Sequence, residues 1–240
     1  MRLPTPLQSG RLIRRYRRFL ADVELDSGET VTAHTPNTGS MMQCAVPGHR
    51  VLLSPSTNPQ RKLAWTLELM EVNGHWVDTH THRANRVVEE GLRQGWLEGL
   101  QGYAVRPEYP FGASRIDFLL EKEEEKVLLE VKNVTLCCQG DVACFPDAVT
   151  VRGQKHLREL AVARAQGYRA VIFFLVQRGE ALAFTPADAI DPTYGALLRE
   201  VVSQGVEIYA CRTEVTPETV QVAKRLPVCL GPFSTERNTS

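Results

Sequence analysis

The stretch GASRIDFLLEKEEEKVLLEVK, residues 112–132, decides the fold of the second half of the chain. Residues 116–120 and 127–132 follow the two-residue period of a β-strand and carry β-branched and aromatic side chains. The charged run EKEEEK between them is typical of an exposed turn. The stretch therefore predicts a β-hairpin centred between Glu123 and Glu124, with apolar residues 116, 118 and 120 on one face.

A hairpin with this centre brings two carboxylates face to face. Asp117 lies directly opposite Glu130, and Lys132 lies one step along on the same face. Opposed like charges destabilise a strand pair, so we expect a cation between them. Asp117 and Glu130 would supply oxygen ligands to Mg²⁺ or Mn²⁺, with the carbonyl of Val131 as a third ligand.

Lys132 would then hold the attacking water or the charge that develops on a phosphoryl group, next to a metal that activates water. The alternative is that EKEEEK is a solvated turn with Glu130 and Lys132 as an ordinary ion pair at its base. Short patterns of this kind recur by chance, so spacing alone does not decide between the two interpretations.

Longer segments resemble the sugar fermentation stimulation protein A (SfsA) family over residues 11–205. They are AHTPNTGSM, LLSPSTNPQRKLAWTLEL, ANRVVEEGL, GASRIDFLL, LLEVKNVTL and FPDAVTVRGQKHLREL. The resemblance implies an N-terminal OB-like β-barrel followed by a domain similar to the PD-(D/E)xK nucleases, an α/β (α+β) architecture. It also implies DNA binding and a link to sugar catabolism. In the nuclease pattern, the residues that correspond to Asp117, Glu130 and Lys132 form the metal and catalytic site.

Composition sets further bounds. A chain of 240 residues suffices for one large domain or two modest ones. The 28 basic and 28 acidic residues balance, so the molecule as a whole does not attract polyanions. The chain has neither an apolar run long enough for a membrane span nor a signal-peptide core at its N-terminus, so we expect a cytoplasmic protein without membrane partners.

The six cysteines form no CxxC pair and no regular framework. We therefore expect neither a disulfide nor a zinc site. Cys137, Cys138 and Cys144, which flank the proposed metal site, are expected to be free thiols.

Residues 1–81 are predicted to form the barrel, a nucleic-acid-binding domain, because hairpin signals recur there at DSGE and at the Asn73-Gly74 dipeptide. An arginine-rich segment with interleaved aromatic residues would bind nucleic acid through Arg14, Arg15, Arg17 and Arg18. An ordinary solvated edge strand explains these arginines equally well. Residues 34–40 form a loop that either binds a phosphate or a sugar, or has only a structural role. Three histidines, His75, His80 and His82, are expected to be solvated.

Residues 82–240 are predicted to form the second domain, with helices over 83–92 and around Leu157, and a buried strand over 170–176. A helix between two strands indicates an α/β core with a crossover connection. Glu89 or Glu90 either joins the metal site or is surface charge. Further along, Arg152 and Lys155 are expected to bind a phosphate, and Asp147 either caps the helix that contains them or assists the site. Asp191 and Pro192 are expected to begin a last helix. The end of the chain is expected to be a disordered tail.

Two functions follow from these features. One is a metal-dependent nuclease, a phosphodiester hydrolase whose barrel holds nucleic acid, expected to be DNA. The other is a non-catalytic DNA-binding regulator of sugar catabolism genes that keeps the nuclease fold. The complete Asp117, Glu130 and Lys132 set favours the first, because facing carboxylates repel DNA unless a metal covers them. The sequence leaves open whether the nucleic acid is DNA or RNA, whether it is single- or double-stranded, and which sequence is preferred. The oligomeric state of the protein is also left open.

Overall fold

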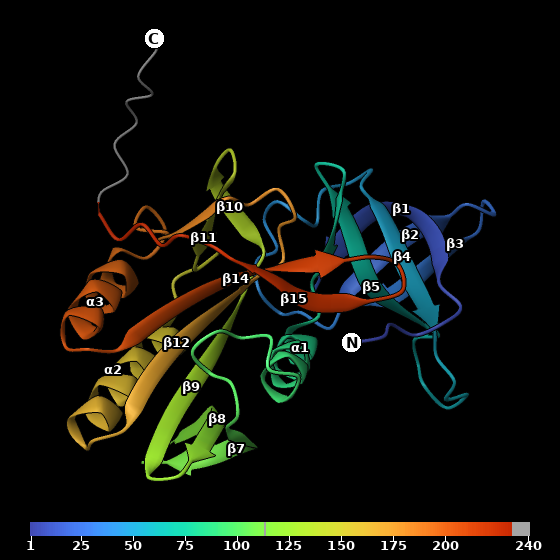
Figure 1. Ribbon diagram of the computed structural model, residues 1–240. Helices are drawn as coiled ribbons and strands as arrows, with labels where there is room; N and C mark the ends of the chain where they lie inside the picture. Colours follow the sequence, from blue (N-terminus) through green and yellow to red (C-terminus); the bar gives the residue numbers. More distant parts are fainter. Residues whose placement is uncertain (113, 232–240) are drawn as a thin grey trace.

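The computed structural model describes residues 1–112 and 114–231, and the predicted tail falls almost entirely outside this part of the chain. An N-terminal β-barrel precedes an α/β domain, and a long helix lies between the barrel and the main sheet (Figure 1). Among the described residues, no helix is both long and apolar enough to cross a membrane.

Five strands close the barrel: β1 (Gln8–Tyr16), β2 (Leu20–Leu25), β3 (Thr30–His34), β4 (Arg50–Pro55) and β5 (Trp65–Val72). Their neighbours are antiparallel in the order β3-β2-β1-β4-β5, and a parallel pairing of β3 with β5 completes the circle. The short strand β6 (His75–Asp78) extends β5. The predicted hairpins at DSGE and at Asn73-Gly74 are confirmed; the latter residues have φ of 52° and 76°, as a two-residue hairpin turn requires.

The second domain is built on a six-stranded sheet of order β15-β14-β12-β9-β8-β7. Its members are β7 (Ala104–Phe111), β8 (Ser114–Lys122), β9 (Glu125–Val134), β12 (Arg169–Val176), β14 (Glu207–Val215) and β15 (Val220–Arg225). The three central strands β9, β12 and β14 are parallel. A smaller sheet contains β10 (Leu136–Gln139), β11 (Val142–Phe145) and β13 (Ala183–Pro186).

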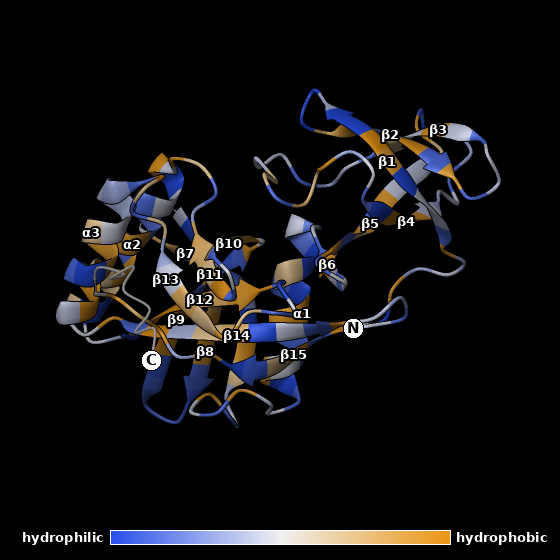
Figure 2. Ribbon diagram, turned by 90° about the horizontal axis from the view of Figure 1, so that it is seen from above, coloured by the Kyte–Doolittle hydropathy of each residue, from blue (hydrophilic) through white to orange (hydrophobic). Residues whose placement is uncertain are grey.

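Helices cover both faces of the large sheet. Helix α1 (Thr81–Arg93) packs on one face, and α2 (Val151–Ala165) and α3 (Pro192–Ser203) pack on the other. Hydrophobic residues follow the strands and the inner sides of the helices, whereas the loops are largely hydrophilic (Figure 2). The predicted crossover is confirmed, since α2 connects the parallel strands β9 and β12.

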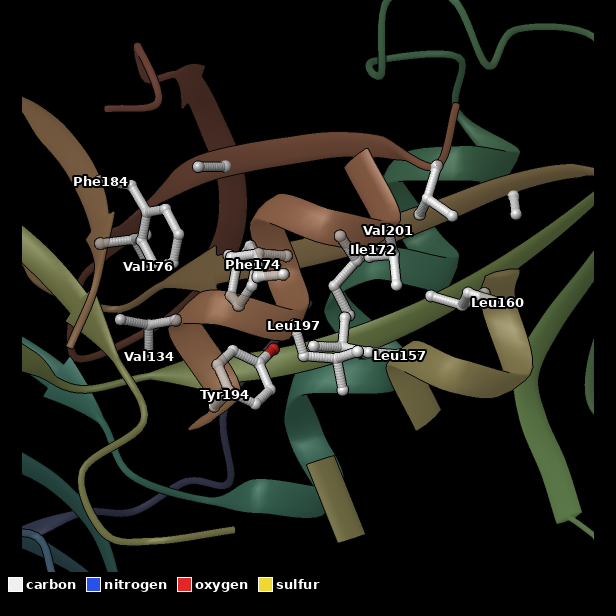
Figure 3. Packing of buried hydrophobic residues seen from close by; sticks show 14 of the residues in the cluster. Val134, Leu157, Leu160, Ile172, Phe174, Val176, Phe184, Tyr194, Leu197 and Val201 are labelled. Carbon is white, nitrogen blue, oxygen red and sulfur yellow. The ribbon is translucent and has the colours of Figure 1, made fainter. Parts of the chain in front are cut away.

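Aromatic side chains fill the core under α2 and α3. Phe174 of β12 stacks on Phe184 with ring centroids 4.1 Å apart, and Tyr194 of α3 is fully buried beside Leu157 and Leu197 (Figure 3). These helices are held on the sheet by apolar packing.

The central hairpin has the predicted register. Phe118 pairs with Leu129, and Lys122 pairs with Glu125. The prediction that 116, 118 and 120 share one face is wrong, however. Ile116 packs in the core on the α2 side, whereas Phe118 and Leu120 pack on the α1 side. The alternation breaks at Asp117, one residue beyond the last paired position, because the two strands separate there.

The prediction for the cysteines is also wrong for one pair. Cys138 and Cys144 form a disulfide with their Cα atoms 5.8 Å apart, because β10 and β11 pair as an antiparallel hairpin. The lack of a CxxC pair and of a regular cysteine framework concealed this pairing. The remaining thiols among the described residues, on Cys44, Cys137, Cys211 and Cys229, are free.

The two domains contact each other through the loop that follows β3. Ser40 donates to the Asp147 carboxylate at 2.8 Å, and Gln43 donates to the main-chain carbonyl of Cys137 at 2.7 Å. The N-terminal amine of Met1 also lies 2.6 Å from Glu90 of α1. The loop of the barrel is therefore hydrogen-bonded to the second domain.

Candidate metal and catalytic site

The candidate site forms where strands β8 and β9 separate. Asp117 lies one residue beyond Phe118 and Leu129, the last pair of the β8–β9 ladder. There its side chain, and not a main-chain carbonyl, accepts the N–H of Val131, with Oδ2 at 2.8 Å. In return, the N–H of Asp117 donates to Glu130 Oε2 at 3.4 Å. The end of the hairpin thus holds the two carboxylates in adjacent positions, as the sequence predicted.

Lys132 and His156 both contact the second carboxylate. Lys132 Nζ lies 2.7 Å from Glu130 Oε1, and His156 Nδ1 of helix α2 donates to the same oxygen. On the other side of the imidazole ring, Arg152 Nε donates to Nε2 at 3.4 Å. Lys132 Nζ also lies 3.2 Å from His156 Nδ1. All but Arg152 are largely buried, which fixes their geometry.

Burial and mutual repulsion set the charge of the two carboxylates. Burial and, after it, the neighbouring charge of Glu130 together raise the pKa of Asp117 to about 6. Burial also acts to raise the pKa of Glu130, but the hydrogen bond from His156 and the charge of Lys132 outweigh it, so this pKa is lowered. Near neutral pH both groups are therefore largely ionised.

A cavity of about 400 Å³ opens above these groups. Asp117, Glu130, Lys132 and Arg152 line it from the second domain, and the barrel contributes a wall through Asn37 and Gly39. Because Asp147 accepts from Ser40 Oγ and from the Met41 N–H at 3.2 Å, the barrel loop is attached to the loop that precedes α2. The residues at 34–40 are thus both structural and part of the cavity wall.

The predicted phosphate-gripping pair is only half present in this cavity. Arg152 lines it, but Lys155 is exposed and lies 3.6 Å from Glu159 one turn along the helix. The inward side of α2 is occupied by His156, four residues after Arg152, whereas position 155 turns outward.

Neither glutamate considered on α1 contacts the carboxylates. Glu89 pairs with Arg93 at 2.7 Å, and Glu90 pairs with the amine of Met1. Instead Asn85 donates to Asp117 Oδ1 at 2.7 Å. Asn85 precedes Glu89 by one turn on the same face of the helix. Helical spacing could therefore indicate which face of α1 meets Asp117, but not which residue on that face makes the contact.

The arginines predicted to bind nucleic acid divide into two groups. Arg14 pairs with Asp22 at 2.8 Å, and Arg15 donates to main-chain carbonyls of the loop after β3, including that of Asn37 at 2.7 Å. Arg17 and Arg18 lie exposed in the turn between β1 and β2. Arg14 and Arg15 thus have partners within the protein.

The donor set suits a hard divalent cation. Two adjacent carboxylates offer oxygen ligands, and within the described residues no third His, Cys, Asp or Glu completes a metal cluster around them. Mg²⁺ and Mn²⁺ are commonly held by one or two carboxylates with water filling the remaining positions, so the residues present fit such an ion.

Comparison with known proteins identifies the family. The model described as "SfsA N-terminal OB domain" matches residues 13–78, and that described as "Sugar fermentation stimulation protein RE domain" matches residues 82–219. The sugar fermentation stimulation protein homolog of Syntrophotalea carbinolica is 65% identical over 96% of this chain and 100% of its own length. Its counterpart in Geobacter metallireducens is 56% identical over the same shares of the two chains.

A solved structure gives the same result. The structure of Pyrococcus furiosus SfsA in complex with Ca²⁺ superimposes with a TM-score of 0.85, at 28% identity, over 95% of this chain and 97% of that one. The predicted resemblance and the predicted OB barrel are confirmed, and this chain belongs to the SfsA family.

Proposed function

We propose that this protein is a divalent-metal-dependent nuclease that hydrolyses phosphodiester bonds in DNA. The observation that carries the proposal is the contact between Asp117 and Glu130 at the open end of the hairpin, with Lys132 and Arg152 around the same cavity. Burying two carboxylates together costs stability unless a cation compensates them. The four side chains match what cleavage of a phosphodiester needs: cation ligands, a water-orienting group and a phosphate-binding group.

Asp117 and Glu130 would hold a Mg²⁺ or Mn²⁺ ion, and the relative from Pyrococcus furiosus forms a complex with another divalent cation, Ca²⁺. Such an ion, when bound, polarises the phosphate and lowers the pKa of a coordinated water. Asn85 and the N–H of Val131 orient the Asp117 oxygens through hydrogen bonds of 2.7 and 2.8 Å.

Lys132 and Arg152 supply the positive charge. Lys132 Nζ, fixed by Glu130, is placed to orient the attacking water and to stabilise the negative charge that develops on the phosphoryl oxygens. Arg152 offers a guanidinium that binds phosphate oxygens at the rim of the cavity. His156 is a positioning residue, since it contacts Glu130 and Arg152 from a buried position.

The test is cleavage of a panel of single- and double-stranded DNA and RNA substrates with Mg²⁺ or Mn²⁺. Wild type is compared with Asp117→Ala and Lys132→Ala, and Glu218→Ala, an exposed residue outside the cavity, is the matched control. We expect cutting by wild type and the control, and a loss of at least about a hundredfold in both site variants.

The outcomes separate the two functions predicted from the sequence. If wild type binds DNA in a salt-sensitive manner but cuts nothing, the proposal fails and the non-catalytic regulator of sugar catabolism genes becomes the better account. If cutting survives both substitutions, the site is wrong or the activity belongs to a contaminant.

A further inference from the structure

We propose that a groove leading from the candidate site, across α1, to a basic hollow at the edge of the barrel holds the single DNA strand that flanks the cut. This inference rests on the proposed function and defines its substrate path. It places the strand in the hollow lined by the ends of β3, β4 and β5, and not on the exposed arginines of the turn between β1 and β2.

Three hollows join to form this groove. The cavity of the candidate site and a neighbouring hollow over α1 are both lined by Asn85, Asp117 and Arg152. The hollow over α1 shares His82 and Arg86 with a third hollow of about 720 Å³ at the junction with the barrel. A chain that leaves the candidate site therefore has a continuous path along the exposed side of α1.

The third hollow is strongly basic. Arg2, Arg61 and Arg86 are exposed along it, and in the described part of the chain none of them forms an ion pair. Glu68 is the acidic residue in its wall, and this carboxylate is already occupied by the buried Arg83 and by Ser54 Oγ at 2.5 Å. The uncompensated charge suits an extended anion such as a phosphate backbone.

The middle hollow is not basic, since three carboxylates, of Glu89, Glu108 and Asp117, line it beside two guanidinium groups, of Arg86 and Arg152. Glu89 is paired with Arg93, and Asp117 belongs to the candidate site. The basic charge is therefore concentrated at the barrel, with Arg86 as the link between the two ends.

Histidines give the barrel end a surface that suits bases. His34, His80 and His82 line the third hollow, and the rings of His80 and His82 lie edge to face, 6.2 Å apart. Burial and then the charge of Arg83 lower the pKa of His80 to about 4, so this ring is neutral near pH 7. Its buried Nδ1 has no hydrogen-bond partner within the described residues.

Neutral aromatic rings stack on unpaired bases, and such stacking requires that the bases be free of a complementary strand. The start of α1 adds to the attraction for phosphate, because its first turn contains no acidic residue to oppose the positive end of the helix dipole. Together these features select a single strand over a duplex.

The test measures binding of a fluorescent single-stranded 20-mer DNA by anisotropy from 50 to 200 mM salt, with EDTA to prevent cutting. The groove variant is Arg61→Gln with Arg86→Gln. The matched control, Arg158→Gln with Lys224→Gln, removes the same charge from exposed positions outside the groove. A third protein, Arg17→Gln with Arg18→Gln, tests the turn between β1 and β2.

We expect the groove variant to bind about tenfold more weakly and its salt slope to fall by about 1.4, since each single-strand phosphate contact contributes about 0.7. The other two proteins should bind like wild type. If the turn variant loses affinity while the groove variant does not, the groove is overturned. A larger loss for duplex than for single-stranded DNA would also overturn it.

Failure of the groove is distinguishable from failure of the nuclease. If wild type cuts DNA and the groove variant binds normally, the groove alone is wrong. If wild type neither cuts nor binds DNA, the proposed function is wrong and the groove is rejected with it.

Discussion

The Asp117 carboxylate is held where its ionised form is disfavoured. Its environment is buried, and the negative charge of Glu130 is adjacent. Hydrogen bonds from Val131 and Asn85 compensate only part of this cost, so the folded-state pKa of about 6 remains above its ordinary value of 3.8. Two measurable consequences follow, one for the metal-free protein and one for metal binding.

Without metal, the protein should lose stability as the pH rises through the window from about 4 to about 6. A carboxyl group whose pKa is raised on folding favours the native state below its unfolded pKa, and this contribution is lost as the group ionises. We expect Asp117→Asn, which keeps the shape of the side chain, to be more stable than wild type by about 2 kcal/mol at pH 7.5 in EDTA.

Urea unfolding at pH 4 and pH 7.5 measures this effect. The advantage of Asp117→Asn should disappear at pH 4, where the wild-type carboxyl is also neutral. An equal difference at both pH values would show that the substitution acts through packing and not through charge.

Metal binding should have the opposite dependence on pH. Because a ligating carboxylate must be ionised, protonation of Asp117 competes with Mn²⁺, and affinity should fall about tenfold for each pH unit below about 6. Calorimetric titration at pH 5 and pH 7.5 measures this, with Glu89→Ala as a control that keeps wild-type affinity. Binding by Asp117→Ala as tight as that by wild type would contradict the assignment.

The carboxylates and Lys132 were predictable because a β-hairpin has a fixed period and one turn sets the register of every pair. Asn85 and His156 were not, because both reach the site from helices whose packing against the sheet depends on the whole fold. Arg14 and Arg15 show the converse: as charges in a sequence they resemble ligand-binding groups, but their partners Asp22 and the loop carbonyls are visible only in three dimensions.

Among the elements, helix α3 packs against α2 and is also hydrogen-bonded to its start through one buried side chain, Asp191. Asp191 caps α3 by accepting the N–H of Tyr194 at 2.9 Å. It also accepts the N–H of Thr150 at 2.9 Å and an amide hydrogen of Gln154 at 3.1 Å, and both of these residues belong to the start of α2. Since α2 carries Arg152 and His156, this cap supports the candidate site.

We therefore expect Asp191→Ala to cost more than an ordinary helix cap, about 2–4 kcal/mol, because it leaves several buried donors without an acceptor. Thr150→Ala is the matched control: it removes one capping bond, from the N–H of Gly153, and should cost about 1 kcal/mol. Chemical denaturation of the two variants gives both values, and equal losses would mean that Asp191 acts on α3 alone.

Element boundaries followed from sequence wherever local chemistry dominates. The Asn73-Gly74 turn and the Asp191-Pro192 helix start are examples, since each depends on a few adjacent residues. The break in alternation at Asp117 and the Cys138–Cys144 disulfide escaped prediction. Both arise where tertiary contacts bend or pair short strands, and the periodicity of the sequence does not indicate such contacts.

At the scale of the whole molecule, the loop after β3 joins the barrel to the second domain at two places. Ser40 and Met41 bind Asp147 beside the candidate site, and Gln43 binds the start of β10.

Removing Arg15 should loosen this loop, since its guanidinium donates hydrogen bonds to three of the loop carbonyls. We expect Arg15→Ala to lose about 1–3 kcal/mol of stability in urea unfolding, and the exposed Arg17→Ala to change it by less than about 0.5 kcal/mol; equal effects would contradict a structural role.

Gln43 gives the sharpest test of coupling between the domains. Its amide donates to the carbonyl of Cys137 and accepts the N–H of the same residue at 3.0 Å, and its oxygen also accepts from the buried Arg178 at 2.6 Å. Gln43→Ala should lower the melting temperature by about 5–10 °C, because it removes one acceptor from the buried Arg178 guanidinium and the side-chain partners of the Cys137 N–H and carbonyl. Gln60→Ala, in an exposed barrel loop, should change it by no more than about 2 °C.

Scanning calorimetry of these proteins also reports cooperativity. If the loop couples the domains, wild type unfolds in one transition and Gln43→Ala separates it into two, with the barrel and the α/β domain melting apart. Two transitions already present in wild type would show that the domains are independent. In that case the cavity wall formed by Asn37 and Gly39 would be loosely held, and the rate of cutting should not depend on Gln43.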